Sequence, residues 1–237
     1  MPELEERRRV ECRLTPDRAL ESLDEAEEFL RDRGLLTLMP DCALPSLFGA
    51  CHEEAYKPGS SGFGLWPKTK YPWGVELAER CLRTRLHKGK GLFMSDGTAA
   101  LADPLCRAEL ARAEKGAFGQ EAQRAVERLA LLGPALLDEL EVGRATRNRL
   151  ERVGAIISRE VLLEPHRHAA ELLRWDQLRP EPSPGGGLDE LVIAGVRAAV
   201  VAPEREAAGW FSWRADAGRL VDEGRLVRPE PGWVSLP

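Results

Sequence analysis

One short sequence pattern occurs twice in this chain, and it constrains the fold more than any other feature. Leu150-x3-Gly154-x-Ile156-Ile157 is matched by Leu220-x3-Gly224-x-Leu226-Val227. In each copy, apolar residues one helical turn apart precede a glycine, which permits the left-handed conformation that commonly ends a helix. A β-branched or leucine run then predicts a strand. Because each copy also follows a proline-started helix and a turn, we expect one helix–turn–helix–strand unit to be used twice.

The C-terminal copy continues into a predicted β-hairpin. Residues 225–228 and 233–236 favour strands, and Pro229-Glu230-Pro231-Gly232 between them favours a turn. A helix-turn-helix followed by such a hairpin is typical of the winged helix, which often binds nucleic acid. We therefore predict a mainly α protein with short β wings, built from tandem winged helix-turn-helix units.

Turn-forming residues divide the chain into four predicted parts. Residues 1–118 are expected to form an N-terminal winged-helix-like subdomain with a basic and aromatic loop, and residues 119–179 a central winged helix. The Pro- and Gly-rich run 180–187 is predicted to be a linker, and residues 188–237 a C-terminal winged helix.

Hydrophobic periodicity predicts individual helices within these parts. We expect helices at 16–33, with Thr15 as N-cap, at 75–86 and at 166–178. A helix that begins near Asp96 is expected to be interrupted by Pro104.

Composition indicates a soluble globular protein. Hydrophobic residues make up 43% and charged residues 31%, which excludes a disordered chain. The longest apolar stretch, 191–202, is short and broken by Arg197, and the N-terminus has no apolar signal-peptide core. We expect a cytoplasmic protein with no membrane partner.

Metal and cofactor signals are absent from the sequence pattern. The five cysteines are scattered without a CxxC pair, which favours reduced thiols, and His166-x-His168 has no evident third ligand. There is no glycine-rich phosphate loop. We therefore expect neither a metal site nor a cofactor.

The third helix of the central unit carries the clearest basic surface. Leu150 and Val153 mark its buried side, so Arg147, Asn148, Glu151 and Arg152 are expected to face outward, with Arg144 just before them. Arginine pairs with guanine and asparagine with adenine in the major groove of duplex DNA. Arg144, Arg147, Asn148 and Arg152 are therefore candidate DNA contacts, although Glu151 equally fits an ordinary solvated surface.

A loop in the N-terminal part interleaves basic and aromatic residues. Lys68, Lys70 and Lys88 are candidate phosphate contacts, and Phe63, Trp66, Tyr71 and Trp73 are candidate base-stacking residues. The alternative is structural, because Trp66 and Trp73 could instead anchor the loop to the core.

The order of these parts resembles a known family. The segments concerned are Gly34-Leu35-Leu36, Leu44-Pro45-Ser46-Leu47-Phe48, Trp66-Pro67-Lys68-Thr69-Lys70-Tyr71-Pro72-Trp73, His168-Ala169-Ala170-Glu171-Leu172-Leu173, and the two winged helices. Together they resemble the AlkZ-type family of bacterial winged-helix DNA glycosylases, which excise alkylated bases or unhook crosslinks. The resemblance implies DNA binding linked to DNA repair.

The same resemblance places the catalytic motif just after the first helix. Family members have Gln-x-Gln or Gln-x-Asp there, whereas this chain has Thr37 and Met39. Methionine cannot orient water, so the standard mechanism is not expected; Asp41 is a weak catalytic candidate if the register shifts by two. An active glycosylase on alkylated or crosslinked bases is the first alternative, and a regulatory or protein-interaction module is the second.

Overall fold

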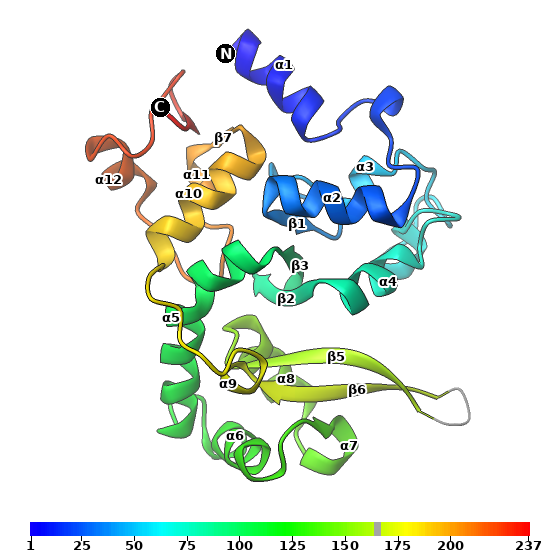
Figure 1. The fold of residues 1–237 in the computed structure, drawn as a ribbon, viewed down its shortest axis with the longest axis vertical. Helices are drawn as coiled ribbons and strands as arrows, with labels where there is room; N and C mark the ends of the chain where they lie inside the picture. The colour runs from blue at the N-terminus through cyan, green and yellow to red at the C-terminus, as the bar shows by residue number, and fades with distance from the viewer. Residues whose placement is uncertain (164–166) are drawn as a thin grey trace.

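The computed structural model describes residues 1–163 and 167–237, and these residues are mainly helical with small antiparallel sheets (Figure 1). The N-terminal part contains α1 (Pro2–Glu11), α2 (Leu23–Arg33), β1 (Leu35–Thr37), α3 (Leu47–Ala50), α4 (Trp73–Arg80), β2 (Leu82–His87), β3 (Lys90–Met94) and α5 (Asp96–Glu114), with short 3-10 helices η1 (Pro16–Arg18) and η2 (Gly62–Leu65). The central part contains α6 (Gln120–Leu132), β4 (Ala135–Leu136), α7 (Leu137–Leu140), α8 (Arg144–Arg152), β5 (Ile156–Leu163), β6 (Arg167–Arg174) and α9 (Trp175–Leu178). The C-terminal part contains α10 (Leu188–Ala199), β7 (Val201–Pro203), α11 (Glu204–Ala207), α12 (Ala217–Asp222) and β8 (Trp233–Ser235).

One order of elements recurs in the N-terminal and central parts, and the C-terminal part (α10–β7–α11–α12–β8) has the same order with a single final strand. A helix and a short strand are followed by two helices and then two strands, as in α2–β1–α3–α4–β2–β3 and α6–β4–α7–α8–β5–β6. The strand order is β1-β3-β2 in the first sheet and β4-β6-β5 in the second, so the last strand lies in the middle both times. In the C-terminal part β7 pairs with β8, and Val227 forms an isolated bridge to Ser235 on the other side.

The glycine in each copy of the repeated sequence pattern has the predicted backbone conformation. Gly154 and Gly224 have φ of 70° and 71°, a region that side-chain-bearing residues rarely adopt. Each therefore ends its helix and turns the chain toward the following strand or bridge.

The predicted helix at 16–33 is wrong at its start. Residues 16–18 form only η1, and α2 begins after Ser22, whose hydroxyl accepts a hydrogen bond from the Glu25 backbone N–H. Leu20 is fully buried and its N–H donates to the Ala50 carbonyl at 2.9 Å, which takes this segment out of a helix. Tertiary burial therefore decides the boundary.

Three other helix predictions need correction. Residues 82–87 and 167–174 are strands, because β2 pairs with β3 and β6 lies between β4 and β5. Helix α5 runs through Pro104 without interruption, and it changes direction along its length in Figure 1, as expected of a helix that contains proline.

The largest core joins the three parts. It contains Leu86 from β2, Ile157 from β5 and Val196 from α10, together with Ala102 of α5. Smaller clusters lie under α2 and α4, and between α6 and α8. No described helix has the length and apolar character needed to cross a membrane.

The predicted linker packs along α5. The Gly187 N–H donates to the Leu101 carbonyl at 2.9 Å, and a Cβ at Gly186 would lie 2.7 Å from the Leu101 backbone. Glycine is thus required at 186 by close approach as well as by its φ of 111°. The predicted part boundaries remain predictions, but this run is not a free tether.

The carboxylate of Asp103 on α5 contacts both α9 and the run 180–187. It is buried and accepts hydrogen bonds from the Trp175 indole at 2.7 Å and from the Ser183 N–H at 2.8 Å. Arg107, one turn further along α5, donates to both carboxylate oxygens. The Asp103 side chain therefore connects α5 with the end of the central unit and with the run 180–187.

We predict that Asp103→Asn lowers the free energy of unfolding by about 3 kcal/mol, because an amide cannot accept all these bonds and leaves buried donors unsatisfied. Urea denaturation measures the change. Asp32→Asn, at an exposed position on α2, is the matched control and should change stability by less than about 0.5 kcal/mol. Equal effects would contradict the assigned role.

The same carboxylate predicts an acid-dependent stability. Burial raises its pKa, but hydrogen bonds from Ser183, Trp175 and Arg107 outweigh burial and hold the pKa of Asp103 below its ordinary value. Its contribution is therefore complete above the unfolded pKa of about 3.9 and is lost as pH falls through the folded value. When the pH is lowered from about 6 to about 3, the free energy of unfolding of the wild type should therefore fall more than that of Asp103→Asn.

Candidate nucleic-acid interface

Helix α8 is held in place by contacts from α6 and by its own buried side. Leu150 is fully buried in the core beneath it. At its N-terminus, Glu121 of α6 accepts hydrogen bonds from the Gly143 N–H at 2.7 Å and from the Thr146 hydroxyl. These bonds lower the pKa of Glu121, so the cap is ionised at neutral pH. The orientation of α8 is thus fixed at its N-terminus and along its buried side.

One face of α8 is basic and exposed. Arg144, Asn148 and Arg152 are all exposed and recur every four residues, so they lie on the same side of the helix. None of these side chains forms an ion pair with a side chain that the structure describes. Their guanidinium and amide groups are available to a ligand.

The neighbouring face of α8 is turned inward, contrary to the sequence prediction. Glu151 is 1% exposed, and Arg147 is half-buried beside it. The Arg85 Nε of β2 lies 3.2 Å from the Glu151 carboxylate, and the Arg147 Nε lies 3.8 Å from it. The prediction that Glu151 faces outward was wrong because β2 packs against this side of α8.

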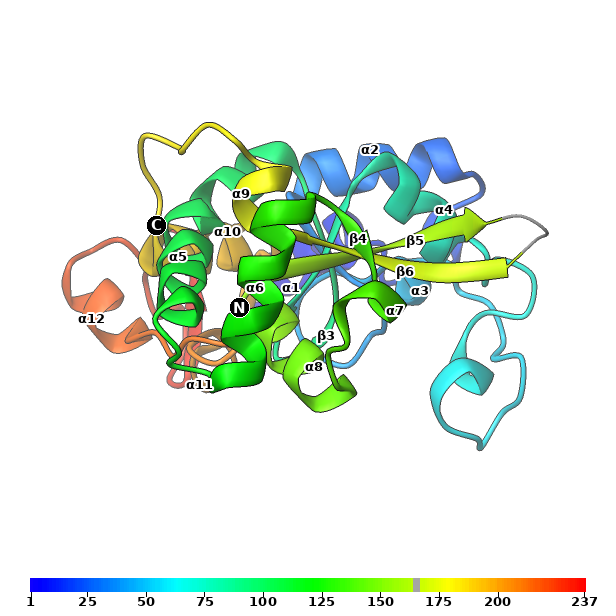
Figure 2. The ribbon, with the colours of Figure 1, turned by 90° about the horizontal axis from the view of Figure 1, so that it is seen from below.

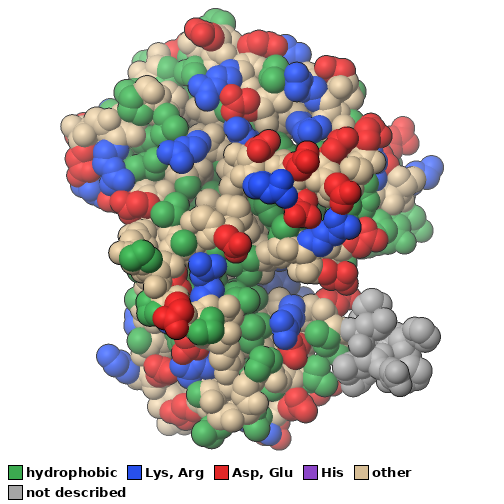
Figure 3. All heavy atoms as spheres, viewed as in Figure 1, with side chains coloured by type: hydrophobic (Ala, Val, Ile, Leu, Met, Phe, Trp, Pro, Cys, Tyr) green, Lys and Arg blue, Asp and Glu red, His purple; other side chains and the backbone are tan. Residues whose placement is uncertain are grey.

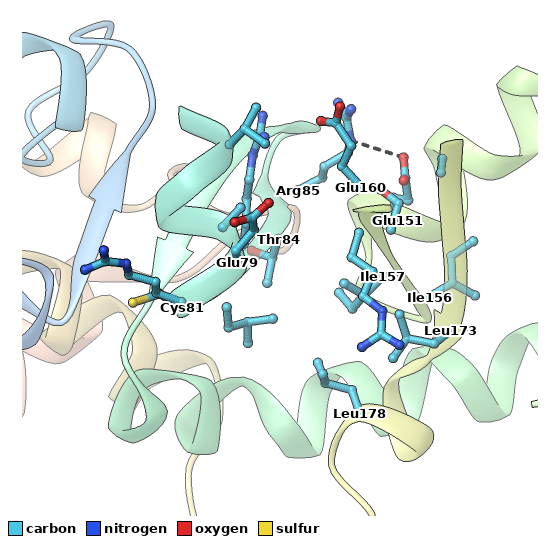
Figure 4. Close-up of a pocket in the computed structure, with 18 of the residues that line it drawn as sticks. Glu79, Cys81, Thr84, Arg85, Glu151, Ile156, Ile157, Glu160, Leu173 and Leu178 are labelled. Atoms are coloured by element: carbon cyan, nitrogen blue, oxygen red, sulfur yellow. Dashed lines mark ion pairs between the residues drawn. The ribbon is translucent and has the colours of Figure 1, made fainter. Parts of the chain in front are cut away.

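A cleft of about 780 Å³ opens between α4 and β2 on one side and α8, β5 and β6 on the other. Figure 4 shows Cys81, Thr84 and Arg85 on one side, and Ile156, Ile157 and Leu173 on the other. Leu178 lies at the floor. In Figure 3 the molecule is hollowed between its upper and lower parts on the face shown.

The cleft has mixed charge. Arg80, Arg83, Arg85, Arg147 and Arg159 line it together with Glu79, Asp96, Glu151 and Glu160. Desolvation lowers the pKa of Arg83, which packs over the Phe93 ring. Both Glu151 carboxylate oxygens lack a hydrogen-bond donor among the described residues, so they can accept bonds from a ligand or from water.

Sequence reasoning missed Arg83, Arg85 and Arg159 as residues that line the cleft. The alternation of Arg83 and Arg85 with Thr84 and Leu86 is a strand pattern that could have identified β2. The pairing of β2 with α8 is long-range, and no local signal predicts it.

The aromatic loop divides into anchoring and exposed residues. Trp66 packs on Phe48 with ring centroids 5.2 Å apart, and Trp73 packs against the same core cluster. Phe63 and Tyr71 stay 49% and 40% exposed, with centroids 5.4 Å apart. Their rings therefore offer stacking surface, whereas Trp66 and Trp73 have the structural role considered as the alternative.

The three predicted lysines also differ. Lys70 Nζ donates to the Leu20 carbonyl at 2.7 Å and lies over the Trp73 ring, so its ammonium is used internally. Lys68 is exposed on the loop. Lys88 is exposed in the β2–β3 turn, with φ of 54°. Lys68 and Lys88 can contact a phosphate without breaking these bonds.

The two positions that the sequence resemblance relates to a catalytic motif have no free polar group. Thr37 is 1% exposed, and its hydroxyl lies 2.9 Å from the Met39 carbonyl and 3.3 Å from the Pro45 carbonyl. Met39 packs against the core under α2. Asp41 lies 2.5 Å from Lys90 Nζ and is therefore held in an ion pair. Neither Thr37 nor Met39 can position water at a ligand.

Asp41, Cys42 and His87 are the described side chains best placed to hold a metal ion, because their ligand atoms all lie within 4.8 Å of one another. Burial raises the pKa of the Cys42 thiol to about 11 and lowers the pKa of His87, so both are neutral near pH 7. His166-x-His168 lies outside the residues whose side chains are described.

Comparison of the chain with protein-family models, with curated proteins and with solved structures gives no match.

We predict that Arg85→Ala lowers the free energy of unfolding by about 2 kcal/mol, because it leaves the buried Glu151 charge with only the more distant Arg147. Arg159→Ala is the matched control; Arg159 is paired with Glu171 on the surface of β5 and β6, and its loss should cost less than about 1 kcal/mol. Chemical denaturation compares the two. If Arg159→Ala is the more damaging variant, the buried pair does not stabilise the contact between β2 and α8.

Proposed function

We propose that this protein binds duplex DNA through the exposed face of α8, and that its three repeated parts are tandem winged helix-turn-helix units. The order of helix, strand, two helices and two strands in the N-terminal and central parts supports this assignment, and the C-terminal part has the same order with a single final strand. Helix α8 is the third helix of the central unit, the position that enters the major groove in helix-turn-helix proteins.

The single observation that carries the proposal is the exposed stripe of Arg144, Asn148 and Arg152, whose side chains form no ion pair with a described side chain. Eight residues at 1.5 Å per residue give the stripe a length of about 12 Å, which matches the width of the major groove. Arginine forks suit phosphate and guanine, and asparagine suits adenine. Most other arginines that the structure describes are paired with carboxylates, whereas Arg144 and Arg152 form no ion pair with a described side chain.

The loop around η2 supplies a second contact region in this proposal. Figure 2 shows α8 and this loop, which bears the cyan helix, at the same lower edge of the molecule. Lys68 would contact phosphate, and Phe63 and Tyr71 would stack on accessible bases. By contrast, acidic and basic side chains are interspersed over the face shown in Figure 3, without an extended basic patch.

A relation to DNA repair remains part of the proposal through the resemblance to the AlkZ-type glycosylases, but without their standard mechanism. Thr37 and Met39 offer no group that can activate water, so we predict no release of base from alkylated duplex DNA. Release by the wild-type protein that is abolished in Asp41→Asn would contradict this and favour an active glycosylase.

A protein-interaction role is the second candidate, and one observation favours it. Leu131 and Leu132, at the end of α6, are 87% and 58% exposed. Contiguous exposed apolar surface can mark a protein-interaction site. Such an interface would respond little to salt, whereas DNA binding weakens steeply with ionic strength.

We predict that Arg144→Ala/Arg152→Ala weakens binding to a fluorescent duplex by roughly tenfold or more at low salt, because two cationic contacts are lost. Fluorescence anisotropy measures the affinity. Arg18→Ala/Arg197→Ala removes the same charge from exposed positions in η1 and α10 and is the matched control.

The control separates a specific face from a general charge effect. The proposal requires the α8 variant to bind distinctly more weakly than the control variant. Equal weakening would show that net charge alone governs binding and would overturn the assignment of α8.

A further inference from the structure

Three side chains with different metal-binding atoms meet beside the end of β2. Asp41 and Cys42 belong to the loop after β1, and His87 is the last residue of β2. A carboxylate oxygen, a thiol sulfur and a ring nitrogen lie within 4.8 Å of one another. This group is separate from the exposed stripe of α8, and its assignment does not depend on DNA binding.

The hydrogen bond of His87 fixes which ring nitrogen faces the group. Nδ1 lies 2.7 Å from the Trp210 backbone carbonyl, and a carbonyl can only accept, so Nδ1 carries the hydrogen. In the neutral ring Nε2 therefore has a free lone pair. A backbone carbonyl in this position is the usual outer partner of a metal-binding histidine.

Two acceptors then face each other. Nε2 lies 3.7 Å from Oδ1 of Asp41, and an ionised carboxylate is also only an acceptor. A cation between them would resolve this arrangement. Tetrahedral zinc with bonds of about 2.1 Å would place its ligands about 3.4 Å apart, close to the observed separation.

The surrounding residues already hold the ligands in place. Glu206 Oε1 accepts hydrogen bonds from the Ala43 N–H at 2.5 Å and from the Trp210 indole at 2.9 Å. This carboxylate therefore fixes the peptide that follows Cys42 and the residue whose carbonyl orients His87. This support comes from α11 and the segment after it, so the C-terminal part of the chain holds ligands that lie in the N-terminal part.

We propose that Asp41, Cys42 and His87 bind one zinc ion, with water as the fourth ligand. Thiolate, imidazole and carboxylate together suit zinc, and three protein ligands leave one position open. On binding, the Cys42 thiol releases its proton to solvent as the sulfur–zinc bond forms. The ion braces the loop after β1 against β2.

Lys90 is the competing cation at this site. Its Nζ lies 2.5 Å from Oδ2 of Asp41, the oxygen that does not face His87. Replacing it with an uncharged side chain removes repulsion of a dication. Lys90→Met therefore tightens zinc binding several-fold, an outcome that a damaged site would not give.

The test titrates zinc into metal-free protein in competition with a chromophoric chelator. One equivalent should bind, and the affinity should fall at least about tenfold in Cys42→Ser and Asp41→Asn. Cys81→Ser, at a cysteine remote from the cluster, is the matched control and should bind as the wild type does. Cobalt as a probe should give a thiolate charge-transfer band that Cys42→Ser lacks, with folding checked by circular dichroism.

Two results would overturn the zinc site. The first is the absence of stoichiometric binding by the wild-type protein, which would make Asp41 and His87 an ordinary proton-sharing pair. The second is binding that Cys42→Ser and Cys81→Ser weaken to the same extent.

Discussion

The buried carboxylate of Asp103 is the interaction on which the arrangement of the three parts depends. Its side chain lies on α5, and its hydrogen bonds reach Trp175 at the end of the central unit and Ser183 in the connecting run. Since the carboxylate is buried, each of these donors is far more costly to leave unpaired than it would be in water. The end of the central unit and the connecting run are therefore both held against α5, and β2, which lies in the same part of the chain as α5, packs against α8.

This contact divides α8 into two faces with different roles. Arg147 and Glu151 are used internally, where they meet Arg85 and line the cleft. Arg144, Asn148 and Arg152 remain at the surface. Under the proposed function, DNA would therefore approach α8 only from the exposed side, and the cleft behind it would be a separate feature. The zinc inference concerns a third place, beside the end of β2, and would tie the loop after β1 to the hairpin that contacts α8.

Much of the local structure could be predicted from the sequence. Gly154 and Gly224 end their helices with positive φ, as the repeated Leu-x3-Gly pattern indicates. What local patterns could not provide is the identity of the partner that covers each face. Glu151 is buried because a strand far away in sequence packs on it, and Lys70 is withdrawn from solvent by the Leu20 carbonyl. Residues 82–87 fit both a helix, because Leu82 and Leu86 are one turn apart, and a strand, because Arg83 and Arg85 alternate with Thr84 and Leu86; pairing with β3 makes them a strand. Cys42 and His87 likewise become neighbours only through the tertiary fold.

The dependence of DNA affinity on salt tests the central claim most directly. In a log–log plot of the binding constant against salt concentration, each phosphate contact contributes a slope of about −0.9. If Arg144 and Arg152 both contact phosphate, the slope for Arg144→Ala/Arg152→Ala should be shallower than that of the wild type by about 2. An identical slope for the two proteins, or the absence of wild-type binding to duplex DNA even at low salt, would contradict the proposed role of α8.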